Sequence, residues 1–212
     1  MYDKYFVIGM NKTATVTFDH IFKKNGLKSI HDHNIKNWDL KKYDCFSDIG
    51  HEYDTYYNSL LKHCKCNIKN AIFILNIREM DKWLKSRFKH GIKYNQDWAK
   101  PASVELTKEW IYDRERYHKD ILEYFKDQPE KLIIVNIDKE GWEDYINTRL
   151  NFKQQSITPQ HVNKTDMNNS EHINLIKIVD DTLESLNYKS DTVLLEDESL
   201  VEEYKKIYDN YM

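Results

Sequence analysis

Three continuous apolar segments constrain the fold of this chain more than any other feature of its sequence. They are YFVIG at residues 5–9, AIFILNI at 71–77 and KLIIVNI at 131–137. Segments of this length, rich in branched and aromatic side chains and nearly free of polar ones, predict strands that are buried on both faces. Apolar residues at helical spacing follow the first strand at 14–25 and precede the third at 103–126.

The alternation of strands and helices predicts an α/β fold, in which a mostly parallel sheet lies between two helical layers. We therefore expect a three-layer α/β/α domain, with ligands bound outside the carboxyl ends of its strands. The length of 212 residues suits one domain, 1–212, whose last helices occupy about 170–212. The remaining expected elements are a strand at 27–31, helices at 53–66, 140–150 and 170–187, a helix N-capped by Asp81, a C-terminal helix, and irregular segments at 32–52, 89–102 and 153–169.

The charges are nearly balanced, with 32 Lys and Arg against 35 Asp and Glu. This balance argues against a general binder of nucleic acids or membrane surfaces. The chain has three cysteines, which indicates a reducing compartment rather than a disulfide framework. Neither a signal peptide nor a transmembrane segment is apparent, so we expect a soluble, cytoplasmic protein that does not bind membranes.

The segment FVIGMNKTATVTF, residues 6–18, carries the first sign of function. A buried strand, a short turn and a helix N-terminus form a site for anions, because the first N–H groups of a helix have no internal partner and its dipole adds about half a positive charge. Lys12 adds a full charge, and the hydroxyls of Thr13, Thr15 and Thr17 are further donors. The segment therefore suits a phosphate or sulfate group, although it lacks the glycines of a Walker A loop.

A second basic element follows the strand at 71–77. Arg78 comes directly after this strand, and Ser86 lies eight residues further on, in REMDKWLKS. An arginine at the carboxyl end of a neighbouring strand can grip a phosphate bidentately, and a serine on the following helix can share it.

With these two elements the sequence resembles the sulfotransferases, and in particular a branch of small sulfotransferase-like proteins. In that family a KTGT-type loop holds the 5′-phosphosulfate of 3′-phosphoadenosine 5′-phosphosulfate (PAPS), and an Arg and a Ser eight residues apart hold its 3′-phosphate. The resemblance covers roughly residues 4–165 and implies a P-loop nucleoside-triphosphate-hydrolase-like fold. Its other matching stretches are GLKSIHD, YDCFSDIG, AIFILNIREMDKWLKS, YHKDILEYFKDQPEKLIIVNIDKEGWE and PQHVNK.

The resemblance implies that the chain is a PAPS-dependent enzyme that sulfates a hydroxyl or amine of a small-molecule or glycan acceptor. Lys12 would stabilise the leaving phosphate, and no metal would be needed. The phosphosulfate would lie against the loop residues Thr13, Ala14, Thr15, Val16 and Thr17, and the 3′-phosphate against Arg78 and Ser86, with Lys164 as a late basic residue near the cofactor. The candidate bases for the acceptor proton are His31, His33 and Asp48.

One departure from the family pattern lies at Ala14, where the loop usually has glycine. Alanine in a left-handed conformation costs on the order of 1 kcal/mol. Either this loop avoids that conformation, or cofactor affinity has weakened. A second departure is Glu79-Met80, where many members have an acidic residue and a proline.

Two other functions stay open at this point. One is a small nucleoside or nucleotide kinase, which would require a Walker loop and a magnesium-binding acidic residue. The other is a degenerate sulfotransferase-like protein that only binds a ligand or partner. A group of aromatic side chains in and just before the long helix is expected to line the core or the acceptor pocket; its members are Trp98, Trp110, Tyr112, Tyr117 and His118.

Overall fold

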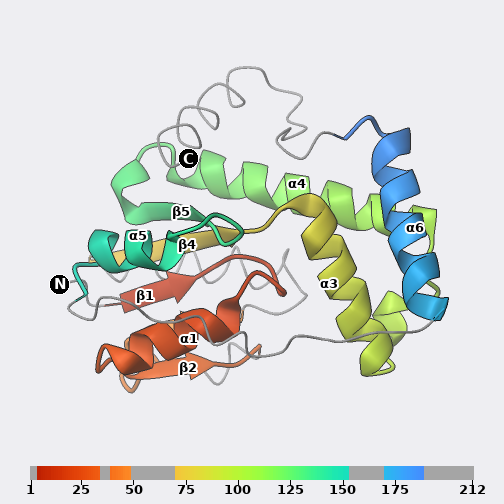
Figure 1. Ribbon diagram of the computed structural model, residues 1–212. Helices are drawn as coiled ribbons and strands as arrows, with labels where there is room; N and C mark the ends of the chain where they lie inside the picture. Colours follow the sequence, from red (N-terminus) through yellow and green to blue (C-terminus); the bar gives the residue numbers. More distant parts are fainter. Residues whose placement is uncertain (1–3, 34–38, 49–69, 153–169, 189–212) are drawn as a thin grey trace. The chain divides into compact units, whose positions relative to one another are not determined.

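The computed structural model describes residues 4–33, 39–48, 70–152 and 170–188. These residues contain a five-stranded sheet in which every pairing is parallel (Figure 1). The strands lie in the order β2-β3-β1-β4-β5. Their bounds are β1 Lys4–Val7, β2 Ser29–His31, β3 Cys45–Ser47, β4 Ala71–Ile77 and β5 Leu132–Asn136.

Five α-helices and two short 3₁₀ helices accompany the sheet in the described residues. The α-helices are α1 Thr15–Lys24, α3 Met80–Lys93, α4 Val104–Phe125, α5 Trp142–Arg149 and α6 Ser170–Ser185, and the 3₁₀ helices are η3 Asp97–Ala99 and η4 Pro129–Lys131. The chain forms two compact units. Among the described residues, the first unit holds those of 1–77 and 125–162, and the second those of 78–124 and 163–209. The expectation of a single domain stays a prediction.

In the first unit, α1 and α5 cover one face of the sheet. Alternate residues of the strands, such as Tyr5 and Val7 of β1, join one buried cluster. Phe18 and Phe22 of α1 and Ile146 of α5 belong to the same cluster. The two helices therefore use their apolar sides to bury one face of the sheet, as the helical spacing in the sequence predicts.

The opposite face of the sheet carries a row of stacked aromatic rings. The ring of Phe6 lies 5.1 Å from that of Phe46 and 5.1 Å from that of Phe73, centroid to centroid. Phe73 in turn lies 5.0 Å from Phe125. All four side chains are buried. Burial of both faces explains why the strands are apolar without interruption rather than alternating.

In the described part of the second unit the regular elements are helices. Its α3 and α6 are joined by an ion pair of 2.7 Å between Lys85 Nζ and Asp180 Oδ1. On α3 and α4, the rings of Phe88 and Trp110 lie 4.3 Å apart. None of the helices in the described part of the chain combines the length and the apolar character that a membrane crossing needs.

The expected α/β class and parallel sheet are confirmed, and β4 has the predicted bounds. Three expectations are wrong. The segment 32–52 contains β3, which the pattern misses because only three residues, between charged neighbours, form the strand. The N-cap of α3 is Glu79, and Asp81 lies in its first turn. Much of the expected loop at 89–102 is helical, because α3 continues to Lys93 and η3 follows. The expected elements at 53–66, 153–169 and the C-terminus lie outside the described residues.

The strand order identifies one place in the sheet that is suited to a ligand. From β1 the chain passes through α1 to β2, two positions to one side, whereas from β4 it continues to β5 on the other side. The neighbouring strands β1 and β4 therefore send their connections in opposite directions. Ligands of open α/β sheets bind at such a topological switch point, outside the carboxyl ends of the strands.

Candidate functional site

The loop that follows β1 is held by a side chain from β4. The backbone N–H of Gly9 donates a hydrogen bond of 2.8 Å to Oδ1 of Asn76. The Asn76 amide group donates to Thr13 Oγ1 at 2.8 Å and also to the Thr13 carbonyl. The Thr13 hydroxyl donates to the carbonyl of Met10. One asparagine therefore fixes both ends of the loop to the neighbouring strand at the switch point.

Gly9 is needed here because the loop and β4 approach each other closely. A Cβ atom at residue 9 would overlap both the carbonyl oxygen and the side-chain oxygen of Asn76. Asn76 itself is 0% exposed. The sequence reasoning did not find Asn76 as a site residue. The sequence feature that could have indicated Asn76 is that it is the single amide side chain in the otherwise apolar strand AIFILNI. A polar group buried in such a strand needs hydrogen-bond partners.

Three residues at this edge of the sheet have a left-handed backbone. Lys12, Ala14 and Asp48 have φ angles of 67°, 65° and 75°. Ala14 therefore adopts the left-handed conformation that favours glycine. The loop does not avoid this conformation, which is one of the two possibilities that the sequence leaves open. The other non-glycine residues with positive φ in the described chain are asparagines, which tolerate it well. Strain of this kind persists where the surrounding structure enforces it, and it gathers at functional sites.

The N-terminus of α1 is suited to an anion. Within the described residues, no side chain caps this helix, whose N-cap is Ala14, and its first turn has no acidic residue. Val16 and Thr17 in that turn are half-buried, as is Lys12 in the loop before it. The N–H groups of the turn and the helix dipole therefore meet no negative charge from the turn itself, and this favours a bound phosphate or sulfate.

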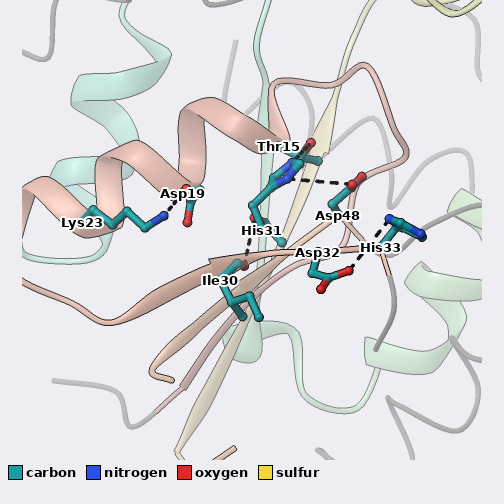
Figure 2. A network of polar contacts seen from close by, with 9 residues as sticks. Thr15, Asp19, Lys23, Ile30, His31, Asp32, His33 and Asp48 are labelled. Carbon is teal, nitrogen blue, oxygen red and sulfur yellow. Dashed lines mark hydrogen bonds and ion pairs between the residues drawn. The ribbon is translucent and has the colours of Figure 1, made fainter. Parts of the chain in front are cut away.

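The Thr15 hydroxyl, the His31 imidazole and the Asp48 carboxylate lie in a row at this turn (Figure 2). Thr15 Oγ1 and His31 Nε2 share a hydrogen bond of 3.0 Å, and His31 Nδ1 lies 3.9 Å from Asp48 Oδ2. The carboxylate favours the hydrogen on Nδ1, which leaves Nε2 to accept from the Thr15 hydroxyl. His31 ends β2 and Asp48 follows β3, so the parallel pairing of these strands brings the two side chains together.

His33 lies apart from this group. Its side chain is 79% exposed, and its Nδ1 lies 3.8 Å from Oδ1 of Asp32; Figure 2 shows the pair away from Thr15 and His31. Of the three candidate bases, the structure therefore brings His31 and Asp48 to the loop and leaves His33 outside. The Thr13 hydroxyl uses its hydrogen on Met10, so a donor for a ligand at residue 13 would be the backbone N–H.

The remaining predicted site residues lie in the second unit or outside the description. Arg78 directly follows β4 and Ser86 lies on α3, and both are half-buried. Lys164 lies outside the described residues. Each of these assignments stays a prediction.

The expected aromatic group divides between the interior and the surface. Trp110, Tyr117 and His118 are buried, whereas Tyr112 is 57% exposed and cannot line the core. Burial, and then the charge of Arg114, lower the pKa of His118 well below its usual range. His118 is therefore a neutral core residue at pH 7. The Trp98 side chain lies outside the description.

Within the described ranges, no group of three or more His, Cys, Asp or Glu side chains is placed to hold a metal ion. No protein-family model matches the chain, and no curated protein matches it. The chemistry of the site therefore has to be argued from its own residues. These residues supply a loop with a positive charge and several hydrogen-bond donors, next to His31, whose Nε2 can accept a proton.

We predict that Asn76→Ala destabilises the protein by about 2–4 kcal/mol, because it leaves the Gly9 N–H and the Thr13 carbonyl buried without partners. Urea unfolding measures this free energy. Asn136→Ala is the matched control: it also lies at a strand end, accepts one hydrogen bond of 3.0 Å from the Asp138 N–H, and should cost no more than about 1.5 kcal/mol. Equal losses in the two variants would contradict the role given to Asn76.

We predict that Ala14→Gly raises the free energy of unfolding by up to about 1.5 kcal/mol. Relief of left-handed strain gains about 1–2 kcal/mol, and the greater freedom of glycine in the unfolded chain offsets about 0.5–1 kcal/mol of it. Thermal unfolding of the two proteins tests this. A loss of stability, the ordinary result of Ala→Gly in a helix, would show that Ala14 is not left-handed.

Proposed function

We propose that this protein is a PAPS-dependent sulfotransferase that transfers a sulfuryl group to a hydroxyl or amine acceptor. The observation that carries the proposal is the loop after β1. It brings Lys12 and an uncapped helix N-terminus to the switch point of a parallel sheet, in a strained conformation that Asn76 enforces. The proposal includes a three-layer, P-loop-like arrangement of the whole chain.

The loop fits the phosphosulfate of the donor better than a neutral ligand. Backbone N–H groups at residues 13–17 and the charge of Lys12 complement an anion. The hydroxyl of the half-buried Thr17, in the first turn, makes no hydrogen bond within the described residues and is a further donor. By the resemblance of the sequence to the sulfotransferases, Arg78 and Ser86 bind the 3′-phosphate, with Lys164 as a later basic contact.

When bound, the donor supplies a sulfuryl group whose transfer to the acceptor breaks the bond between sulfur and the 5′-phosphate oxygen. The protein's part is to position this group and to neutralise charge. Lys12 provides the positive charge that stabilises the departing phosphate. The N–H groups of residues 13–17 hold the oxygens around it, so that no metal ion is required for charge neutralisation.

His31 is the base in this proposal. The acceptor loses its proton as its oxygen or nitrogen bonds to sulfur, and Nε2 of His31 is the atom that takes it up. Asp48 lies on the Nδ1 side, where its carboxylate stabilises the imidazolium that forms. The Thr15 hydroxyl, which contacts Nε2 in this structure, links the base to the loop that binds the donor.

The kinase alternative is less well supported. Phosphate binding by a Walker loop needs a glycine-rich turn ending in Gly-Lys-Ser or Gly-Lys-Thr. Here Gly9 is the one glycine of the loop, and its place is required by the contact with Asn76. The other alternative is a protein that binds the nucleotide without catalysis. Such a protein would be stabilised by the bisphosphate and would transfer no sulfate from PAPS.

We predict that 3′-phosphoadenosine 5′-phosphate, the desulfated donor, stabilises the protein and that ATP with magnesium does not. A ligand at 100 times its Kd raises stability by about 2.7 kcal/mol, which corresponds to a Tm increase of about 5–10 °C for a protein of this size. Thermal unfolding with each nucleotide measures the difference. Stabilisation by ATP with magnesium alone would favour a kinase.

The matched variants for this experiment lie in the loop before α1 and at the last residue of α1. Lys12→Met should lose part of the stabilisation by the bisphosphate, because it removes the charge next to the loop. Lys24→Met, at the exposed last turn of α1, should keep it. A Lys12→Met protein that is stabilised as strongly as the unaltered protein would remove Lys12 from the site.

We predict that His31→Gln lowers turnover by about 10²–10⁴-fold, the usual contribution of a general base, with little change in donor affinity. His33→Gln should be as active as the unaltered protein, because His33 is exposed and paired with Asp32. Transfer of labelled sulfate from PAPS to a panel of phenols, alcohols and amines measures turnover. Full activity of His31→Gln on every acceptor used by the unaltered protein would assign the base elsewhere.

A further inference from the structure

A buried arginine of α4 contacts the start of α3 at three points. Arg114 is 6% exposed. Its Nη2 donates to the carbonyl oxygen of Arg78, and its Nη1 lies 3.3 Å from Sδ of Met80. Its guanidinium carbon lies 5.2 Å from the centre of the Trp83 ring. All of these residues belong to the second unit.

The hydrogen bond to the Arg78 carbonyl falls where the sheet ends. Ile77 is the last residue of β4, and its carbonyl oxygen accepts a hydrogen bond of 3.0 Å from the N–H of Ile137, the residue that follows β5. The chain then turns through Arg78 and Glu79 into α3, which begins at Met80. A backbone carbonyl at such a junction needs a donor when it is buried, and a guanidinium supplies a charged one.

The three contacts fix the backbone of residue 78 to the first turn of α3. Met80 and Trp83 lie in that turn, and Ser86 lies on the same helix. A helix is rigid over this length, so the position of Arg78 relative to Ser86 depends on how the junction between them is held. Arg114 holds the junction from its two sides, the carbonyl before the helix and the side chains at its start.

We infer that Arg114 is a positioning residue, which holds Arg78 and Ser86 in the arrangement that binds a nucleotide 3′-phosphate. The inference rests on the proposed function, in which these two residues bind that phosphate. Arg114 acts through the backbone of residue 78 and does not touch the ligand. Removing the Arg114 side chain leaves Arg78 and Ser86 unchanged but removes the contact that fixes their relative position.

A different role for Arg114 would be to balance the charge of its neighbour Glu115. Glu115 is buried, and burial raises the pKa of its carboxyl group while the charge of Arg114 opposes the rise. The Glu115 carboxylate also accepts a hydrogen bond of 3.1 Å from the Tyr188 hydroxyl. If charge balance were the whole role, Glu115→Gln and Arg114→Met would have similar effects on stability, and neither would change the preference for one nucleotide over another.

The test compares affinities for two nucleotides by calorimetry: 3′-phosphoadenosine 5′-phosphate and adenosine 5′-monophosphate, which lacks the 3′-phosphate. In Arg114→Met the preference for the bisphosphate should fall by about tenfold or more, because a displaced Arg78 loses about one charge-assisted hydrogen bond to the 3′-phosphate. The affinity for the monophosphate should stay within about twofold. A general loss of folding would instead lower both affinities together.

Arg87→Met is the matched control. Arg87 is equally buried and lies on α3, with its guanidinium carbon 5.4 Å from the centre of the Trp83 ring and 4.4 Å from that of Trp110. This variant should keep the ratio of the two affinities. If Arg114→Met does not fold, Arg114→Lys serves in its place: its ammonium cannot reproduce the forked donor, so the ratio should fall there too.

Three outcomes overturn the inference, and they are distinguishable. If the unaltered protein binds both nucleotides equally, both the proposed function and this inference fail. If the unaltered protein prefers the bisphosphate, Arg78→Ala abolishes that preference and Arg114→Met retains it, the proposed function stands and the inference alone fails. An equal fall of the ratio in Arg87→Met would also overturn it, by showing a general effect of packing against Trp83.

Discussion

The amide side chain of Asn76 is the contact on which the candidate site depends. It accepts from the Gly9 N–H and donates to Thr13, so that one residue of β4 fixes the loop after β1 at its start and near its end. Asn76 is fully buried, and a buried amide that lost either set of partners would cost free energy without compensation. The loop therefore has little freedom to relax, and it keeps Lys12 and Ala14 in left-handed conformations that an unrestrained chain would avoid.

This arrangement is suited to an anion, although the loop lacks the glycines that usually permit such a site. Glycine-rich loops reach the same end through a backbone that is free to adopt positive φ. Here the conformation is imposed on alanine and lysine by contacts with the neighbouring strand. Asp48, after β3, also has a left-handed backbone, and its carboxylate lies 3.9 Å from Nδ1 of His31. Strain and polar contacts thus coincide at the carboxyl ends of neighbouring strands.

The end of β4 has a second role through the residue that follows it. Asn76 is the last polar side chain of the strand, and two residues later the carbonyl of Arg78 accepts from Arg114. In both cases a buried polar group satisfies backbone atoms at a point where regular secondary structure stops. Such groups specify one conformation of a junction, because every alternative leaves a charge or an amide unpaired.

The sequence by itself determined the fold class and the parallel character of the sheet. Apolar runs such as AIFILNI predict strands that are buried on both faces, and this prediction is confirmed. Lysine with threonines at the exit of such a strand predicts an anion site, which stays a prediction. It did not determine β3, whose three residues form a strand only because β1 and β2 pair with them on either side. Nor did it separate His31 from His33, because their difference lies in which one meets Thr15 and Asp48 across strands. The pairing of Gly9 with Asn76, 67 residues apart, and of Arg114 with Arg78 was likewise decided by tertiary structure. Local pattern reports which side chains are buried, whereas the partner of a buried polar group is set by the strand and helix that fold against it.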